Sequence, residues 1–187
     1  MRMVGQHKSV IAVVVILLSS SGGCRELAAA SISRASVPVC SQAHGLTTRM
    51  SVGSGAGGTN YFHIIYTNTA SAVCSLSGIP GVQPVDGARH TSVGPSSSLD
   101  KVSGRGGTVL LAARGGKANT VYAMEDVGDF SRSKCAPKHT DGVRIHLKGV
   151  PVIFTALHTS NPTENLVCTR FRSTSINGVA RGMSGSL

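Results

Sequence analysis

Apolar and polar residues alternate along much of the chain after residue 46, and a period of two is typical of strands. In residues 46–52, Leu46 and Met50 alternate with polar residues, which predicts a strand with one buried face. Residues 61–67 are aromatic or β-branched on both faces, so we expect this strand to lie centrally in a sheet. Further short strands are predicted at residues 72–76, 108–112, 118–124, 143–147, 152–156 and 166–171.

Glycine-containing turn signals separate these predicted strands. Asp86-Gly87, Arg114-Gly115-Gly116 and Asp141-Gly142 are examples, and no segment between the turns sustains a helical period. About seven or eight strands favour a β-sandwich, because two sheets can bury their apolar faces against each other. We therefore predict an all-β, antiparallel sandwich over residues 46–187, with a frayed extreme C-terminus.

The composition agrees with a β-rich domain. The chain has 187 residues, of which 41% are hydrophobic and 4% aromatic, with no Trp, 23 Gly and 7 Pro. This mixture is too apolar for a disordered chain and too rich in turn formers for a helical one. One domain is expected at this length, and no apolar stretch reaches the roughly 18 residues of a membrane-spanning helix.

The first 30 residues have the pattern of an export signal. Basic residues precede the apolar run Val10–Leu18, which is about half a membrane span long. Ala28 and Ala30 then stand at the small-residue spacing that signal peptidases cleave. We predict a signal peptide at residues 1–30, a linker at residues 31–45 and a secreted, extracytoplasmic mature protein.

Cys24 offers an alternative, lipid-anchored form. In Ser21-Gly22-Gly23-Cys24 this cysteine would become the lipidated first residue of a bacterial lipoprotein. The usual pattern places Leu three residues before the cysteine, where this chain has Ser21. Cleavage after Ala30 is therefore the first prediction, and lipidation of Cys24 is the alternative.

An even set of cysteines remains when Cys24 is set aside: Cys40, Cys74, Cys135 and Cys168. Four cysteines allow three pairings. An oxidising compartment favours disulfides, and no spacing resembles a CxxC metal or redox site. The nested alternatives close long loops. The pairing that we favour, Cys40 with Cys74 and Cys135 with Cys168, closes two loops of about 34 residues, each worth roughly 4 kcal/mol.

One string in the chain resembles a known family. Asn68-Thr69, followed by Cys-Ser-Leu-Ser-Gly-Ile-Pro-Gly-Val at residues 74–82, is similar to the domain of unknown function 4232, which occurs in exported actinobacterial proteins. The resemblance extends over about residues 40–181 and includes the Asp86-Gly87 turn and residues 115–118. It implies an immunoglobulin-like sandwich in the cell envelope, and it implies no catalytic residue.

Histidines are the main candidates for metal chemistry. Six of the seven histidines lie after residue 30, and imidazoles on neighbouring strands can hold copper or zinc when they converge. His63 and His146 fall within predicted strands, and His158 is a third candidate. Because no HxH or HExxH spacing occurs, scattered histidines are the simpler interpretation and no cofactor is expected.

Other chemistries have weaker support in the sequence. Residues 182–185 resemble a serine-hydrolase turn only superficially, because they lie at the chain end. The carboxylates in residues 125–129 are interpreted as a solvated acidic turn rather than a glycosidase pair. The Arg-Gly-Gly segments at residues 105–107 and 114–116 fit hairpin turns better than contacts with a nucleic acid, which need stacking aromatics.

Net charge indicates the kind of partner without identifying it. The chain carries +10, and removal of residues 1–30 leaves 15 basic and 7 acidic residues. Such a domain attracts anionic envelope polymers and lipid headgroups through screened, nonspecific forces. We expect a noncatalytic module that contacts an envelope protein, a glycan or an anionic lipid, with no specific nucleic-acid partner. A metal-handling sandwich that uses His63 and His146 is the alternative.

Overall fold

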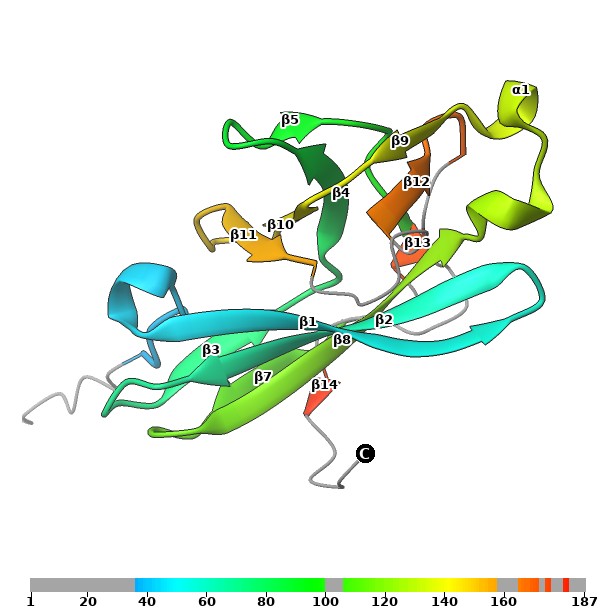
Figure 1. The fold of residues 1–187 in the computed structure, drawn as a ribbon. Coiled ribbons are helices and arrows are strands. Elements are labelled where there is room, and N and C mark those ends of the chain that lie inside the picture. The colour runs from blue at the N-terminus through cyan, green and yellow to red at the C-terminus, as the bar shows by residue number, and fades with distance from the viewer. Residues whose placement is uncertain (1–35, 100–105, 158–164, 172–173, 176–179, 182–187) are drawn as a thin grey trace, which may run out of the picture. The chain divides into compact units, whose positions relative to one another are not determined.

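The computed structural model describes residues 36–99, 106–157, 165–171, 174–175 and 180–181, which form strands joined by turns (Figure 1). None of the helices in these ranges is long and apolar enough to cross a membrane. The predicted signal peptide at residues 1–30, including Cys24, lies outside the described residues, and so does the extreme C-terminus.

The larger sheet is built on three long antiparallel strands. β1 (Leu46–Ala56) pairs with β2 (Thr59–Asn68), and β2 pairs with β8 (Gly116–Glu125). The short strands β13 (Thr174–Ser175) and β14 (Ala180–Arg181) pair with β8, and β6 (Ser98–Leu99) pairs in parallel with β13. The strand predicted at residues 61–67 thus lies between two partners, as expected.

The hairpin between β1 and β2 depends on glycine. It turns at Gly57-Gly58, where φ is 56° and 77°. β1 continues beyond the end predicted at residue 52, and a side chain at Gly53 would meet the Tyr61 carbonyl oxygen at 2.8 Å. Glycine therefore lets the two backbones approach closely, just where the register shifts between Val52 and Gly55.

The second layer contains shorter strands. Its main sheet has the order β11 (Ile153–Ala156), β10 (Gly142–His146), β4 (Gly81–Asp86) and β5 (Thr91–Ser92). Two further antiparallel pairs are β3 (Cys74–Ser77) with β7 (Thr108–Leu111) and β9 (Pro137–His139) with β12 (Leu166–Cys168). The helical segments are η1 (Gln42–His44), η2 (Val127–Asp129) and α1 (Arg132–Cys135).

The core lies between the two layers because side chains alternate along each strand. On β2, Phe62, Ile64 and Tyr66 are fully buried, whereas the residues between them are half-exposed. Val143 and Ile145 of β10 belong to the same buried cluster. Each such side chain contributes about 1.5–3 kcal/mol by leaving water.

A direct polar contact also joins the layers. The Thr155 hydroxyl of β11 donates to the Thr48 hydroxyl of β1 at 2.6 Å. The predicted all-β sandwich is therefore confirmed, and so are both disulfides of the favoured pairing, Cys40–Cys74 and Cys135–Cys168. The immunoglobulin-like topology stays a prediction.

β4 is the longest strand that the sequence pattern did not predict. It contains Pro84, which lacks an N–H group and is depleted in strands. The Pro84 carbonyl accepts from the Val93 N–H at 3.1 Å, on the side of β4 that faces away from Val143 of β10. The ring nitrogen faces the same side, so the ladder between β4 and β10 loses no hydrogen bond.

The folded part begins before the boundary expected at residue 46. Within the predicted linker 31–45, Val39 bridges to Ser75 of β3, and Cys40 is buried. Only six residues separate Val39 from the start of β1, and they include η1. This segment therefore belongs to the domain rather than to a linker.

Candidate functional site

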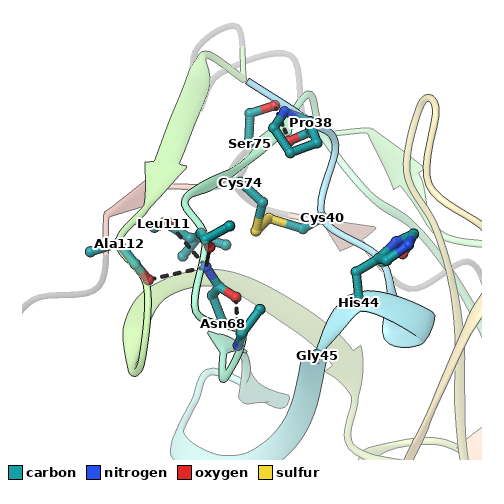
Figure 2. Close-up of a disulfide and its surroundings, with 12 residues drawn as sticks. Pro38, Cys40, His44, Gly45, Asn68, Cys74, Ser75, Leu111 and Ala112 are labelled. Atoms are coloured by element: carbon teal, nitrogen blue, oxygen red, sulfur yellow. Dashed lines mark hydrogen bonds between the residues drawn. A yellow bond between two sulfur atoms is a disulfide. The ribbon is translucent and has the colours of Figure 1, made fainter. Parts of the chain in front are cut away.

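A three-stranded ribbon surrounds the Cys40–Cys74 disulfide (Figure 2). β3 pairs with β7 on one side and bridges to Val39 on the other. The Cys40 N–H donates to the Ser75 carbonyl at 3.0 Å, and the Ser75 N–H donates to the Pro38 carbonyl at 2.8 Å. We call the segment Val37–Cys40 together with β3 and β7 the ribbon.

The inner face of the ribbon is apolar and buried, whereas the outer face combines exposed aliphatic side chains with polar ones. The inner face consists of Cys40, Cys74, Leu76, Val109 and Leu111, none more than 8% exposed. The outer face carries Val37, Val39 and Leu110, with Val73 just before β3, all 38–48% exposed, and also the polar residues Ser75, Ser77 and Thr108. Val39 and Leu110 are both partners of Ser75, so they share a row. Gathered apolar side chains of this kind mark contact surfaces more often than scattered ones do.

A half-open hollow of about 490 Å³ borders the ribbon, lined by residues 38–39, 44–45 and 69–74. Gly45 shapes it, because φ there is 81° and a side chain would meet the Ala70 nitrogen at 2.9 Å. The Thr69 N–H and hydroxyl both donate to the Gly45 carbonyl at 2.8 Å. The His44 ring makes a hydrogen bond through Nδ1 with the Ser41 hydroxyl at 2.7 Å.

Asn68 holds the wall of the hollow against the ribbon (Figure 2). Its Nδ2 group lies 2.8 Å from the Ala72 carbonyl, 3.2 Å from that of Leu111 and 3.1 Å from that of Ala112. Its Oδ1 atom accepts from the Ala70 N–H at 3.0 Å. Asn68 is fully buried, and this one side chain bonds the buried Leu111 carbonyl and three part-buried backbone groups.

Basic side chains border the ribbon. Lys148 is exposed next to Gly149, where an added Cβ would lie 4.0 Å from the Val39 side chain. Arg114 is exposed in the turn between β7 and β8, and its N–H donates to the Ala70 carbonyl at 2.8 Å. The sequence contains no Asp or Glu in residues 36–85, 106–124 or 142–157.

The carboxylates of the described residues lie towards the other end of both layers. β8 begins beside the ribbon with exposed Lys117 and ends at Glu125, about 27 Å away at the strand rise. In the second layer, Asp141 precedes β10 and Lys148 follows it. Both layers are therefore positive at the end where the ribbon lies.

A cluster of titratable groups occupies the opposite end of the second layer. His139 Nδ1 lies 2.9 Å from Asp86 Oδ1 and 3.4 Å from Asp141 Oδ1. The Gly87 N–H donates to Asp141 Oδ2 at 2.6 Å. Among the described residues, this is the group that could hold a metal ion, with its ligand atoms within 4.8 Å of one another. The hydrogen bond with His139 is the main cause that lowers the pKa of the Asp86 carboxyl.

The histidines that the sequence suggested as ligands are not brought together. His63 lies on β2, on the opposite face from the core residue Ile64. His146 ends β10 and is exposed, on the opposite face from Ile145. The two imidazoles therefore face outward from different layers, whose sheets pack about 10 Å apart. His158 lies outside the described residues.

The acidic segment 125–129 and the Arg-Gly-Gly segment 114–116 form turns, as predicted. Residues 125–129 contain the end of β8 and η2, and Asp126 Oδ1 accepts from the Gly128 N–H at 2.8 Å. Arg114 and Gly115, with φ of 56° and 119°, turn the chain from β7 into β8. The 105–107 segment lies partly outside the described residues.

Two features were missed at the level of sequence. His139 and Asp141 stand two residues apart, but Asp86 is 53 residues from His139, and only the pairing of β4 with β10 brings it near. Val37 and Val39 were assigned to the linker, where two valines carry no periodic signal. The one signal available in the sequence was the spacing of two residues between Val37 and Val39, directly before Cys40.

A family comparison covers most of the chain. The model of the family described as Domain of unknown function (DUF4232) matches residues 40–173. The matched range starts at the first cysteine of the ribbon and includes both disulfides. No curated protein and no solved structure matches the chain. The disulfide-linked sandwich described above therefore belongs to the DUF4232 family.

Proposed function

We propose that this chain is an exported, noncatalytic binding module of the cell envelope. The observation that carries the proposal is the outer face of the ribbon, where four aliphatic side chains are exposed together. Folded domains rarely leave such residues grouped at the surface unless something covers them. The Cys40–Cys74 disulfide and two backbone hydrogen bonds hold this face in a fixed shape, which suits recognition.

The cysteines support the export part of the proposal. Disulfides persist outside the cytoplasm, where thiols are not kept reduced. Two of them link segments 33 and 34 residues apart in this domain. If Cys24 carries a lipid, the ribbon begins 13 residues later, within about 45 Å of the anchor at full extension.

The lining of the hollow suits binding better than acid–base catalysis. Aliphatic side chains and backbone groups dominate it, and no carboxylate stands among its lining residues. His44, its one imidazole, is hydrogen-bonded to Ser41 within the same turn. A general base needs a titratable group directed at a bound substrate and oriented by a further group.

Photo-crosslinking in producing cells tests the proposal. A photoreactive amino acid is placed at Val39 in the outer face or at Val52, which is 40% exposed on β1 of the larger sheet. We expect a crosslinked envelope component from position 39 and none from position 52. Equal capture at both positions, or none at either, would count against a binding face at the ribbon.

A second candidate function, metal handling, has a specific observation in its favour. Asp86, His139 and Asp141 offer one nitrogen and two oxygen ligands, a set that zinc accepts. Elemental analysis of untagged protein after zinc titration tests it. About one zinc per chain, lost in His139→Ala and kept in His146→Ala, would support this function. No bound zinc, or loss in both variants, would remove it.

A further inference from the structure

We propose that the outer face of the ribbon docks on an anionic lipid bilayer, with the surrounding basic side chains at the headgroups. This inference rests on the proposed function and names the partner of the same surface. Its elements are the exposed aliphatic side chains, the charges around them and the point at which the chain enters the domain.

The outer face provides the apolar part of the contact. Val37, Val39, Val73 and Leu110 stand on three adjacent segments, and all point away from the core. Aliphatic side chains that enter the boundary between headgroups and acyl chains gain free energy in proportion to the area removed from water. The backbone of β3 is paired on both sides, with β7 and with the segment Val37–Cys40, so the centre of the ribbon presents no unpaired strand.

The charges select an anionic surface. Lys148 precedes Gly149, where an added Cβ would lie 4.0 Å from Val39, and exposed Arg114 and Lys117 stand in the turn after β7 and at the start of β8. The carboxylate at the other end of β8, Glu125, is about 27 Å away along the strand. That separation exceeds the Debye length of about 8 Å at physiological ionic strength, so Glu125, which has Arg132 and Lys134 nearby in the sequence, does not neutralise the basic side chains near the ribbon.

In the lipid-anchored form, the point at which the chain enters the domain would bring this face to the membrane first. Cys24 lies 13 residues before Val37, and Val39 makes the bridge to Ser75. A tether that reaches the domain at Val37 holds the outer face closer to its anchor than it holds the acidic end of β8. Anchoring and docking would therefore reinforce each other.

A second copy of the chain is a less suitable occupant. A two-fold contact through this face would bring Lys148 and Arg114 of one copy towards the equally basic surface of the other. Repulsion between like charges opposes that contact, whereas anionic headgroups neutralise the same side chains.

An introduced Trp tests the proposal directly, because the chain contains none. The mature chain predicted to begin at Ser31, which lacks both the apolar run Val10–Leu18 and Cys24, carries either Val39→Trp or the control Val52→Trp. Vesicles of phosphatidylcholine, with or without phosphatidylglycerol, are added at low and high salt. We expect a blue shift of the emission from position 39 with anionic vesicles, diminished by salt, and none from position 52.

Cosedimentation of chains without Trp separates the two parts of the contact. Leu110→Ser is expected to weaken vesicle binding several-fold. Lys148→Gln is expected to weaken it roughly fivefold, whereas Lys134→Gln in α1 leaves it unchanged. Thermal unfolding of each variant checks that the fold is kept.

Several results would overturn the inference. These are no blue shift at position 39, an equal shift at position 52, or equal binding to neutral vesicles. A blue shift that grows with protein concentration without vesicles would assign the face to a second copy instead. If vesicles fail but the crosslinker at Val39 captures an envelope protein, the lipid partner is wrong and the binding module stands. If both fail, the proposed function falls as well.

Discussion

Asn68 shows how much one buried polar side chain can organise. It ends β2, where Leu46 of β1 and Gly116 of β8 are its strand partners. Beyond Asn68 the chain turns towards β3, and the backbone carbonyl and N–H groups of this loop have no neighbouring strand to pair with. The carboxamide offers both donors and an acceptor at one position, so it serves backbone groups of two separate segments.

Replacement of Asn68 by Ala should lower the unfolding free energy by about 2–4 kcal/mol, because the buried Leu111 carbonyl and three part-buried backbone groups lose their partner at once. Chemical denaturation followed by circular dichroism measures this change. The conservative variant Asn68→Asp should be at least as destabilised, since a carboxylate would face carbonyl oxygens with no hydrogen to donate. A loss below about 0.5 kcal/mol for both variants, the range of ordinary surface changes, would contradict this role.

Tyr66 supplies a contrasting case on the same strand. Its side chain is fully buried, and its hydroxyl lies near the Thr120 hydroxyl of β8, but within the part of the chain that the structure describes neither group makes a hydrogen bond of ordinary geometry. Burial raises the pKa of this hydroxyl, so it stays neutral. Tyr66→Phe should therefore raise the unfolding free energy by up to about 1 kcal/mol. A loss of more than about 1 kcal/mol in the same denaturation experiment would show that the hydroxyl is bonded after all.

At the scale of elements, the ribbon depends on the Cys40–Cys74 disulfide. The segment Val37–Cys40 forms a single bridge with β3 and has no long strand of its own. Two backbone hydrogen bonds would hold so short a segment weakly. The disulfide removes the freedom of the intervening loop, so the segment is pinned whenever β3 is folded.

The double variant Cys40→Ala, Cys74→Ala should lose about 2–4 kcal/mol of stability and release the ribbon. Hydrogen exchange of the Cys40 and Ser75 amides, which make the two bonds of the segment, reports the release; in the variant, residue 40 is read as Ala. The matched control is Cys135→Ala, Cys168→Ala, which should lose similar stability and keep slow exchange in the ribbon. Equal acceleration in both variants would mean that the ribbon follows global stability instead.

The sequence pattern predicts a strand well when one face of the strand is buried and its partner strands are long. β2 alternates between buried and half-exposed residues through its whole length, so its period was visible. β4 was hidden by Pro84, and β9 has only three residues. The outer face and the Asp86–His139 contact depend on pairings between distant segments, which local periodicity does not contain.

At the scale of the whole domain, charge and exposed apolar surface are arranged in the same direction. Lys117 and Lys148 lie towards the ribbon end of the two layers, where the described residues include no carboxylate, whereas Glu125 and Asp141 lie towards the other end together with Arg132, Lys134 and Lys138. If the same charges were spread evenly over the surface, the domain would have the same net charge but no preferred orientation towards a charged partner. The separation gives the domain an electrostatic polarity that can align it before contact.

Export makes a prediction about the intact protein that thiol counting and mass together can test. A chain cleaved after Ala30 begins at Ser31, and the four cysteines that follow are all in disulfides, so denatured but unreduced protein should show no free thiol. An uncleaved chain keeps Cys24 and would show one thiol at full-length mass. A lipoprotein would also show none, but its mass would correspond to a start at Cys24 with added acyl chains.

The expected result is the mass of residues 31–187 lowered by four hydrogens, since each disulfide removes two. The control is the same protein reduced before denaturation, which should regain those hydrogens and react at all four cysteines. Free thiols at Cys40 or Cys168 in unreduced protein would place the mature chain in a reducing compartment. The prediction of export would then be wrong, because disulfides such as Cys40–Cys74 and Cys135–Cys168 persist in oxidising compartments outside the cytoplasm.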